Sequence, residues 1–504
     1  MSAVSAPTSP THAARALAAL SSSHTSSPHL SAESICPIDT INLLIDDFFT
    51  YIHPLCPFPH EPSFREAWKR REDLTNSSFL ALLSAMIAAL VASFPRSPQR
   101  HLKAQNLAGL FPDHMSLANR CQKVCATARG PGYLESESLN VYDAATSYFL
   151  ALVGTYTYRW RQGRLYFGEC LTIIRTLGFH KAEPSHIRSN RLPTAVNSFG
   201  TGSDGESQQA IDCITQEMGR RIFWTLFVGI KSCHQLGAAF SELAMPPPTP
   251  SEQYPPLPTE VDDFCIYPTH IDPQPAGLLP TIAGFNANVR VFNSYNALST
   301  MEIAWGIDAV VDWDRQRRVM FESLRRCKDA VAKLPHELVV GLGKQPHGNG
   351  HQSPGGFYPN FNLDRDLTMS LTSLSPHLNM EQTPEQRRRM QYEIQKANIY
   401  VSCLATRSFV VEKYWNLCEA RDRSRSGSRQ NSPGTGVTQA GLDSLLPKAP
   451  TSDYDMIEFE MKQERESIMK DLLVVLGSIK EVHMEPNADS FVSPLHIPYQ
   501  GHLN

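Results

Sequence analysis

Apolar residues along most of this chain recur every three or four positions, which is the period of an α-helix with one buried face. The first such segment follows Asp39, a suitable N-cap residue, and its apolar positions are Ile41, Leu44, Ile45, Phe48, Phe49 and Ile52. The same period predicts further helices at 64–70, 77–94, 114–127, 140–158, 163–178, 211–237, 280–305, 311–333, 363–374, 384–417 and 455–482. No stretch alternates as a strand would, so we expect an all-α fold: a large multi-helix domain with polar insertion loops.

Polar, low-complexity stretches divide this helical pattern. Residues 1–35 are rich in Ser, Ala, Thr and Pro, and we expect them to be disordered. The helical domain would then occupy residues 36–420, interrupted by polar or proline-rich loops at 183–209, 244–262 and 336–360. A basic, serine-rich linker, a C-terminal helix and a tail follow at 421–453, 454–483 and 484–504.

The net charge and the cysteine content indicate which partners and which cellular compartment to expect. The chain has 504 residues and a net charge of −4, which gives no overall attraction to nucleic acid or anionic lipid. Its 11 cysteines are odd in number, scattered and mostly inside apolar helical patterns, as expected for reduced thiols in the cytosol or nucleus.

We expect neither secretion nor membrane insertion. Residues 1–34 lack a basic start followed by an apolar core. The longest uncharged apolar run, Phe79 to Phe94, contains Ser84 and is stopped by Pro95. It is shorter than the about 20 residues that span a bilayer, so we interpret it as a buried helix.

Patterns typical of enzymes are weak or missing. Gly200 to Gly205 matches G-x-G-x-x-G but lies in a polar loop without the strand and helix that a dinucleotide site requires. His336-Glu337 starts like a zinc-protease helix but lacks the second histidine. We therefore expect no catalytic residue, cofactor or metal ligand, and interpret lone histidines such as His53, His180 and His234 as core or cap residues.

The most informative segment is Glu217-Met218-Gly219-Arg220-Arg221-Ile222-Phe223-Trp224. Two arginines run into an apolar helical face made by Ile214, Met218, Ile222, Leu226 and Ile230. A buried guanidinium requires carboxylate or carbonyl partners, so we expect at least one of the two arginines to be paired with such groups. We also expect Trp224 to be buried against the Phe48/Phe49 helix or the 163–178 helix.

Two earlier segments accompany it in a fixed order. One contains Tyr51-Ile52-His53-Pro54, followed by further prolines and aromatic residues. The other is a helix that opens near Gly163 and ends at Gly178-Phe179-His180, with Gly178 as a natural C′ residue.

These three segments resemble the fungal-specific transcription factor domain, the middle homology region of fungal zinc binuclear cluster transcription factors. The resemblance covers roughly residues 40–270, and its landmarks here are Tyr51, His53, Pro54, Gly163, Gly178, His180, Arg220, Arg221, Phe223 and Trp224. It implies a regulatory domain that works in the nucleus and controls transcription of metabolic genes by RNA polymerase II.

The sequence departs from the family pattern in three respects. Where the family commonly has Asp-Arg after the tryptophan, this chain has Ile230-Lys231, and Gly237-Ala238-Ala239 replaces Gly-Arg-Pro. More importantly, the six-cysteine zinc cluster is missing, because the nearest cysteine pair, Cys121 and Cys125, lies four residues apart. We interpret that pair as core packing.

Three explanations of the missing cluster remain open. The cluster lies upstream of Met1, which the linker-like N-terminus favours; or it has been lost and the protein acts through partners; or another element contacts DNA. Zinc would be a cofactor only in the first case. The expected partners are DNA, either indirectly or through the missing N-terminal zinc cluster, transcriptional co-regulators, a second copy of the chain and a small-molecule effector. The alternative function is a soluble helical interaction module or co-regulator without DNA binding.

Basic clusters do not change this interpretation. We expect Lys69-Arg70-Arg71 and Arg387-Arg388-Arg389 to lie on solvated helix faces. The segment from Arg421 to Pro433 is basic and serine-rich, which suits a flexible linker and, alternatively, a nuclear-import or phosphorylation-controlled segment.

Overall fold

The computed structural model describes residues 30–136, 139–182, 212–237, 243, 245–306, 310–340, 383–430 and 452–487. These residues form helices and one isolated bridge between Ile266 and Ile271, with no strand among them, so the all-α prediction is confirmed. The predicted loop at 183–209, most of the one at 336–360 and the predicted helix at 363–374 lie outside the described residues.

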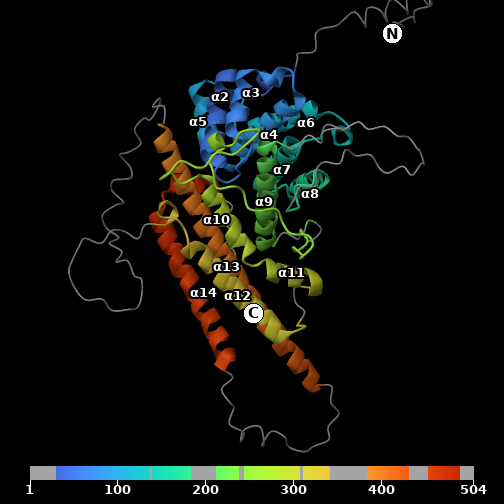
Figure 1. Ribbon diagram of the computed structural model, residues 1–504, viewed down its shortest axis with the longest axis vertical. Helices are drawn as coiled ribbons and strands as arrows, with labels where there is room; N and C mark the ends of the chain where they lie inside the picture. Colours follow the sequence, from blue (N-terminus) through green and yellow to red (C-terminus); the bar gives the residue numbers. More distant parts are fainter. Residues whose placement is uncertain are drawn as a thin grey trace, which may run out of the picture.

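The N-terminal helices gather at one end of the molecule (Figure 1). They are α2 (Ile38–Asp47), η2 (Phe48–Ile52), α3 (Glu61–Lys69), η3 (Glu72–Leu74), α4 (Ser77–Ser93), α5 (Arg96–Ala104), α6 (His114–Arg129), η4 (Tyr133–Glu135), α7 (Val141–Tyr156), α8 (Trp160–Thr176) and α9 (Cys213–Gln235). Helix α4 is apolar on all sides, as expected of a helix that α6 and α7 cover. Its apolar side chains are buried except for Ala92, which is partly buried.

The C-terminal helices extend away from this end (Figure 1). They are η6 (Asp263–Cys265), α10 (Ile282–Asn293), α11 (Asn296–Trp305), α12 (Trp313–Ala332), η7 (His336–Leu338), α13 (Pro384–Gln430), α14 (Ser452–Ser478), α15 (Glu481–Met484) and η9 (Glu485–Asn487). The long α13 packs against α10, α12 and α14, and its N-terminal part also contacts η2. Helix α13 therefore joins the two ends of the molecule.

One hydrophobic core runs through both groups of helices. It extends from Ala32 and Ile35, before α2, to Val475 in α14 and Ile479 just after it. The C-terminal helix is thus packed along the rest of the fold. Among the described residues no single helix is long and apolar enough to cross a bilayer. Helices α4 and α5 taken together have the length and composition of a membrane span, but the chain bends by 107° between them.

Several predicted boundaries were wrong. Order begins before residue 36, because Ala32 is buried and its N–H donates to Asp73 Oδ2 over 3.0 Å. The predicted helix at 280–305 breaks at Ser294 and Tyr295, where Tyr295 turns into the core and its hydroxyl donates to the Lys231 carbonyl. Helix α5 was not predicted, since its nine residues are mostly polar.

The predicted linker also starts too early. Helix α13 continues to Gln430, ten residues beyond the predicted end of the domain at 420. Its continuation is supported at Arg421, whose guanidinium lies 4.2 Å from the centre of the Trp313 ring of α12. Residues 431–450, most of the predicted linker, lie outside the described residues.

Candidate functional site

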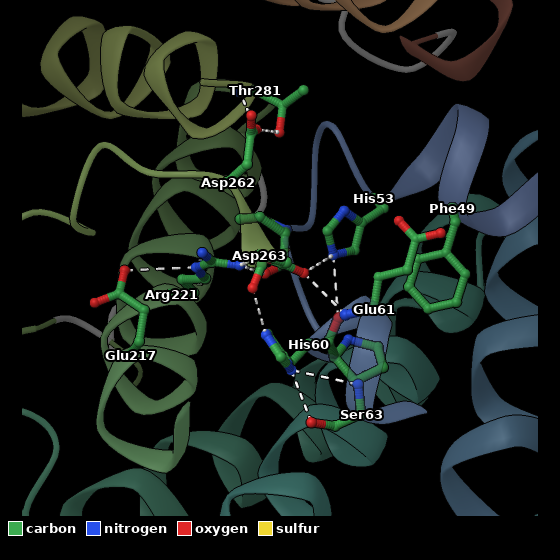
Figure 2. A network of polar contacts seen from close by, with 12 residues as sticks. Phe49, His53, His60, Glu61, Ser63, Glu217, Arg221, Asp262, Asp263 and Thr281 are labelled. Atoms are coloured by element: carbon green, nitrogen blue, oxygen red, sulfur yellow. Dashed lines mark hydrogen bonds and ion pairs between the residues drawn. The ribbon is translucent and has the colours of Figure 1, made fainter. Parts of the chain in front are cut away.

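The adjacent carboxylates Asp262 and Asp263 connect four helices in the interior. They lie at the end of the proline-rich crossing from α9 to α10, which is the loop predicted at 244–262. Asp262 is 5% exposed, and Asp263 is the first residue of η6. We call these two residues, with the side chains that pair with them, the acidic hub (Figure 2).

Asp263 joins α9 to the start of α3. Its Oδ1 accepts from Arg221 Nη1 over 2.6 Å, and its Oδ2 accepts from the N–H of Glu61 over 2.8 Å. Glu61 is the first residue of α3, so this N–H has no partner within the helix, and a carboxylate is favourable at that position. Burial alone would raise the pKa of Asp263, but Arg221 and the neighbouring histidines hold it well below its usual range.

Arg221 is held from two further directions. Its side chain is 1% exposed, Nη1 also donates to the Pro57 carbonyl over 3.1 Å, and Nε lies 3.5 Å from Glu217 Oε1 (Figure 2). Glu217 is equally buried and accepts from the N–H of Thr259 over 2.8 Å. The expected pairing of a buried arginine with carboxylates is therefore present, and it fixes the proline-rich crossing to α9.

Two histidines complete the contacts around Asp263. His60 donates from Nε2 to the Asp263 carbonyl over 2.8 Å, while its Nδ1 faces Ser63 in the first turn of α3. His53 Nε2 donates to the Pro59 carbonyl over 3.1 Å and lies 3.7 Å from Asp263 Oδ2. Burial lowers the pKa of His53 despite that carboxylate, so its imidazole is neutral at pH 7.

Asp262 joins the start of α10 to α13. Its Oδ1 accepts from the N–H of Thr281, the N-cap position of α10, over 2.9 Å. Its Oδ2 accepts from Arg388 Nη1 of α13 over 2.8 Å and from Gln274 Nε2 over 2.8 Å. The two neighbouring aspartates thus bind different helices: α3 and α9 at Asp263, α10 and α13 at Asp262.

The first turns of α13 make further contacts with the N-terminal segment. Arg387 donates to Glu61 Oε1 over 2.9 Å and to the Phe49 carbonyl over 3.0 Å. Gln395, one of the buried residues of α13, donates to the Pro54 carbonyl over 3.0 Å. The prediction that Arg387-Arg388-Arg389 form a solvated face is therefore wrong for the first two, because acidic groups distant in sequence face them; Arg389 is exposed.

The predicted glycines have distinct structural roles. Gly163 lies where α7 and α8 come closest: a Cβ on Gly154 of α7 would lie 2.6 Å from the Gly163 nitrogen. Gly178 has φ +81° and follows the α8 C-cap. The Phe179 N–H then bonds the Ile174 carbonyl over 3.1 Å, as in a Schellman motif.

The aromatic landmark positions are buried. Trp224 is 4% exposed, and its Nε1 donates to the Pro256 carbonyl over 3.0 Å. Trp224 and Phe223 both meet Tyr254 edge to face, so both pack on the proline-rich crossing. Tyr51 packs on Phe94, with ring centroids 4.6 Å apart.

The remaining predicted positions lie apart from the hub. Arg220 is only partly buried and lies 3.3 Å from Glu217. His180 follows the end of α8, and burial lowers its pKa. Lys231, which replaces the arginine common in the family, lies 5.0 Å from the centre of the Tyr295 ring, and burial lowers its pKa to about 8.

Within the described ranges no three His, Cys, Asp or Glu side chains are grouped as a metal site would need. Cys121 and Cys125 are both buried in α6, and burial raises the pKa of both thiols. The hub itself is built from balanced ion pairs and helix ends, which suits holding helices in place rather than covalent chemistry.

Comparison with known families agrees with the order of these motifs. The family model described as the fungal specific transcription factor domain matches residues 45–228. The domain begins inside α2 and ends inside α9. Comparison with the curated proteins and with the solved structures gave no match.

The decisive hub residues lie outside this domain and were not predicted. Asp262 and Asp263 follow a proline-rich stretch, where two acidic residues ordinarily indicate a solvated loop. The sequence offered one signal for this partner, because the positive charge of a buried Arg221 requires a carboxylate. Outside the helix that contains Arg221, no spacing in the sequence identifies which carboxylate that is.

Proposed function

We propose that this chain is the regulatory region of a nuclear transcription regulator of the fungal zinc-cluster type, controlling transcription of metabolic genes by RNA polymerase II. The observation that carries the proposal is the fungal specific transcription factor domain at residues 45–228. This is a transcription factor domain and not an enzyme family. Contact with DNA would come from a zinc cluster upstream of Met1 or from a partner protein.

The hub supports a specific way of regulating. The proposal is that the domain and helices α10 and α13 exchange between an inhibited and an active packing. Arg388 and Arg387 are the contacts that such a change would break or form, because they join α13 to Asp262 and Glu61. A co-regulator or a small-molecule effector would bias the exchange.

A tethering experiment tests this function. The full chain is fused to an unrelated sequence-specific DNA-binding module and expressed in a fungal host with a reporter gene. We expect reporter transcription to change several-fold relative to the module alone. Arg388→Ala should alter that output, whereas the adjacent, exposed Arg389→Ala should leave it unchanged.

The alternative, a helical interaction module without a role at DNA, predicts a different result. The fusion would then leave the reporter at the level of the DNA-binding module alone, although the protein is folded and nuclear. An in-frame six-cysteine cluster in the genomic sequence directly upstream of Met1 would independently favour the first function.

A further inference from the structure

Aromatic and apolar side chains are exposed together at the turn between α7 and α8. Tyr158 is 72% exposed and Leu165 is 66% exposed, and the ring of Trp160 meets that of Tyr158 edge to face at 6.4 Å. These three residues line one open hollow of the surface together with Arg159 and Arg161, and we call the five residues the aromatic patch. Large apolar side chains gathered at one exposed place indicate a surface for a partner.

Tyr158 occupies a backbone position that disfavours a tyrosine. It directly follows the C-cap of α7, Thr157, and its φ is +56°. The N–H of Arg159 donates to the Gly154 carbonyl over 2.7 Å, as in a Schellman motif, in which the left-handed residue is usually glycine. A bulky residue in this conformation is strained, and such strain gathers at functional sites. Because Tyr158 is mostly exposed, core packing does not explain why tyrosine rather than glycine stands here.

The charge of the aromatic patch is positive and unbalanced. Arg161 is exposed and has no ion pair among the described residues, and Arg159 donates to neutral side-chain amides of α6. Among the described residues that line the hollow, Glu169 is the one carboxylate, and it is already paired with Arg129 over 2.8 Å. The hollow therefore presents positive charge beside apolar rings, in a chain whose net charge is −4.

We propose that the aromatic patch is a docking surface for an acidic peptide segment of a partner protein. Carboxylates of the segment would pair with Arg159 and Arg161, and an aromatic or aliphatic side chain between them would pack on Tyr158, Trp160 and Leu165. Complementary charge selects the acidic groups, while aromatic and arginine residues commonly supply most of the binding energy of an interface. The inference deepens the function proposed above and rests on it, in that a transcriptional co-regulator would supply the segment.

A nucleic acid fits the aromatic patch less well than an acidic peptide does. Nucleic-acid binding relies on contacts between many basic side chains and successive phosphates, whereas the patch contributes two arginines. Leu165 also lacks the flat face on which a base stacks. An aliphatic or aromatic side chain flanked by carboxylates satisfies all five residues of the patch.

Peptide selection tests the chemistry of the partner. A random peptide library displayed on phage is selected on the purified full chain, and we expect the recovered peptides to be rich in Asp and Glu around a Phe, Trp or Leu. The same selection on a variant that carries both Tyr158→Gly and Arg161→Glu should not recover them. No enrichment, peptides without an acidic excess, or the same peptides from both selections would overturn the proposal.

Tyr158→Gly separates docking from folding. Glycine relieves the backbone strain, so the variant should melt close to the wild-type temperature or above it. Its affinity for the strongest selected peptide, measured by fluorescence anisotropy, should nevertheless fall roughly tenfold. Phe459→Ser is the matched control, because Phe459 is also exposed, at 59%, and α14 lies on the opposite side of the molecule from α8 (Figure 1). Unchanged affinity of Tyr158→Gly would refute the docking role of Tyr158.

Arg161→Glu tests the charge. Glutamate is favourable in the first turn of a helix, so α8 should be retained, while affinity for the acidic peptide should fall roughly tenfold at low salt. Arg389→Glu reverses the charge of another exposed arginine and should leave the affinity unchanged. Replacing Asp and Glu of the peptide by Asn and Gln should remove most of the difference between wild type and Arg161→Glu. If that difference persisted, pairing of Arg161 with the acidic groups would be wrong.

An oligo-dT strand is the probe for the other class of partner. We expect it to bind more weakly than the selected peptide, and tighter binding that Tyr158→Gly abolishes would show a nucleic-acid surface instead. All these measurements use purified protein. Failure of docking is therefore distinguishable from failure of the regulatory function, which the tethered reporter measures separately.

Discussion

At the scale of single residues, the buried guanidinium of Arg221 is the side chain on which the hub depends. It lies between Asp263 and Glu217, and all three groups are largely removed from water. Truncation by Arg221→Ala leaves two buried carboxylates without their partner, which typically costs about 3–5 kcal/mol. We expect a clear fall in the urea concentration at the midpoint of unfolding.

The neighbouring arginine is the matched control. The Arg220 side chain is 20% exposed, and its pairing with Glu217 spans 3.3 Å. A partly exposed ion pair contributes about 1 kcal/mol or less, so Arg220→Ala should shift the midpoint only slightly. Equal shifts for the two variants would contradict the role assigned to Arg221.

Protonation of His53 should make stability depend on pH. Its pKa in the folded protein is lowered by burial, against Asp263 and Glu61, which raise it, and with Arg221, which lowers it further. The unfolded chain therefore binds a proton more readily below its own pKa of about 6.5. The stabilisation from keeping His53 neutral is therefore fully present above about pH 6.5. It is lost as the pH falls from there toward the pKa of His53 in the folded protein. The depressed pKa of Asp263 adds a second loss at more acidic pH, below about 4.

Unfolding midpoints at pH 7.5 and pH 5 measure the first effect. His53→Gln keeps a hydrogen-bonding group but cannot be protonated, so the difference between the two midpoints should shrink. His336→Gln is the control, because the His336 side chain is 92% exposed. If His53→Gln retained the full wild-type pH dependence, the assignment to His53 would be wrong.

At the scale of elements, the close approach of α7 and α8 depends on two glycines. A Cβ at position 154 would lie 2.6 Å from the Gly163 nitrogen and 2.8 Å from its Cα, and backbone atoms cannot rotate away. Gly154→Ala should therefore push the helices apart and destabilise the domain by about 1–3 kcal/mol. Thermal unfolding of the purified variant checks this expectation.

Gly168, also within α8, gives the comparison. The nearest atom to a Cβ there is a terminal carbon of Leu243 at 3.4 Å, an ordinary contact. Alanine favours helix over glycine by up to about 1 kcal/mol, so Gly168→Ala should leave the melting temperature unchanged or raise it. A similar loss in both variants would show that helix contact is not the cause at Gly154.

At the scale of the whole molecule, we expect the chain by itself not to bind a specific duplex DNA sequence. Its net charge is −4, and specific binding needs a positively charged element whose side chains reach base edges. Weak binding through the basic segment that starts at Arg421 would ignore sequence and fade between about 50 and 200 mM salt. Selection from a random duplex pool at physiological salt measures this, and recovery of a defined site would locate DNA recognition within these residues.

The apolar pattern predicted most helices of the described residues because the requirement it reflects is local. A helix such as α9 needs one continuous apolar face, and its four-residue spacing is visible in the sequence whatever covers that face. Gly178 was predicted as a helix end for the same reason, since a left-handed C′ residue is a property of a few neighbouring positions. The boundary at residue 420 failed because α13 continues as a polar helix supported by Arg421 on Trp313, a contact with another element.

The sequence by itself determined the helical fold, the order of the family motifs and the need of a buried arginine for a carboxylate. Only the tertiary structure decided that this carboxylate is Asp263, that Asp262 binds α13, and that Asn288 lines a cavity together with residues of α7, α8, α9 and α13. The physical reason is the distance along the chain over which each kind of interaction acts. Helix periodicity and capping act over a few residues, whereas charge pairing and cavities depend on which distant segments the hydrophobic core brings together.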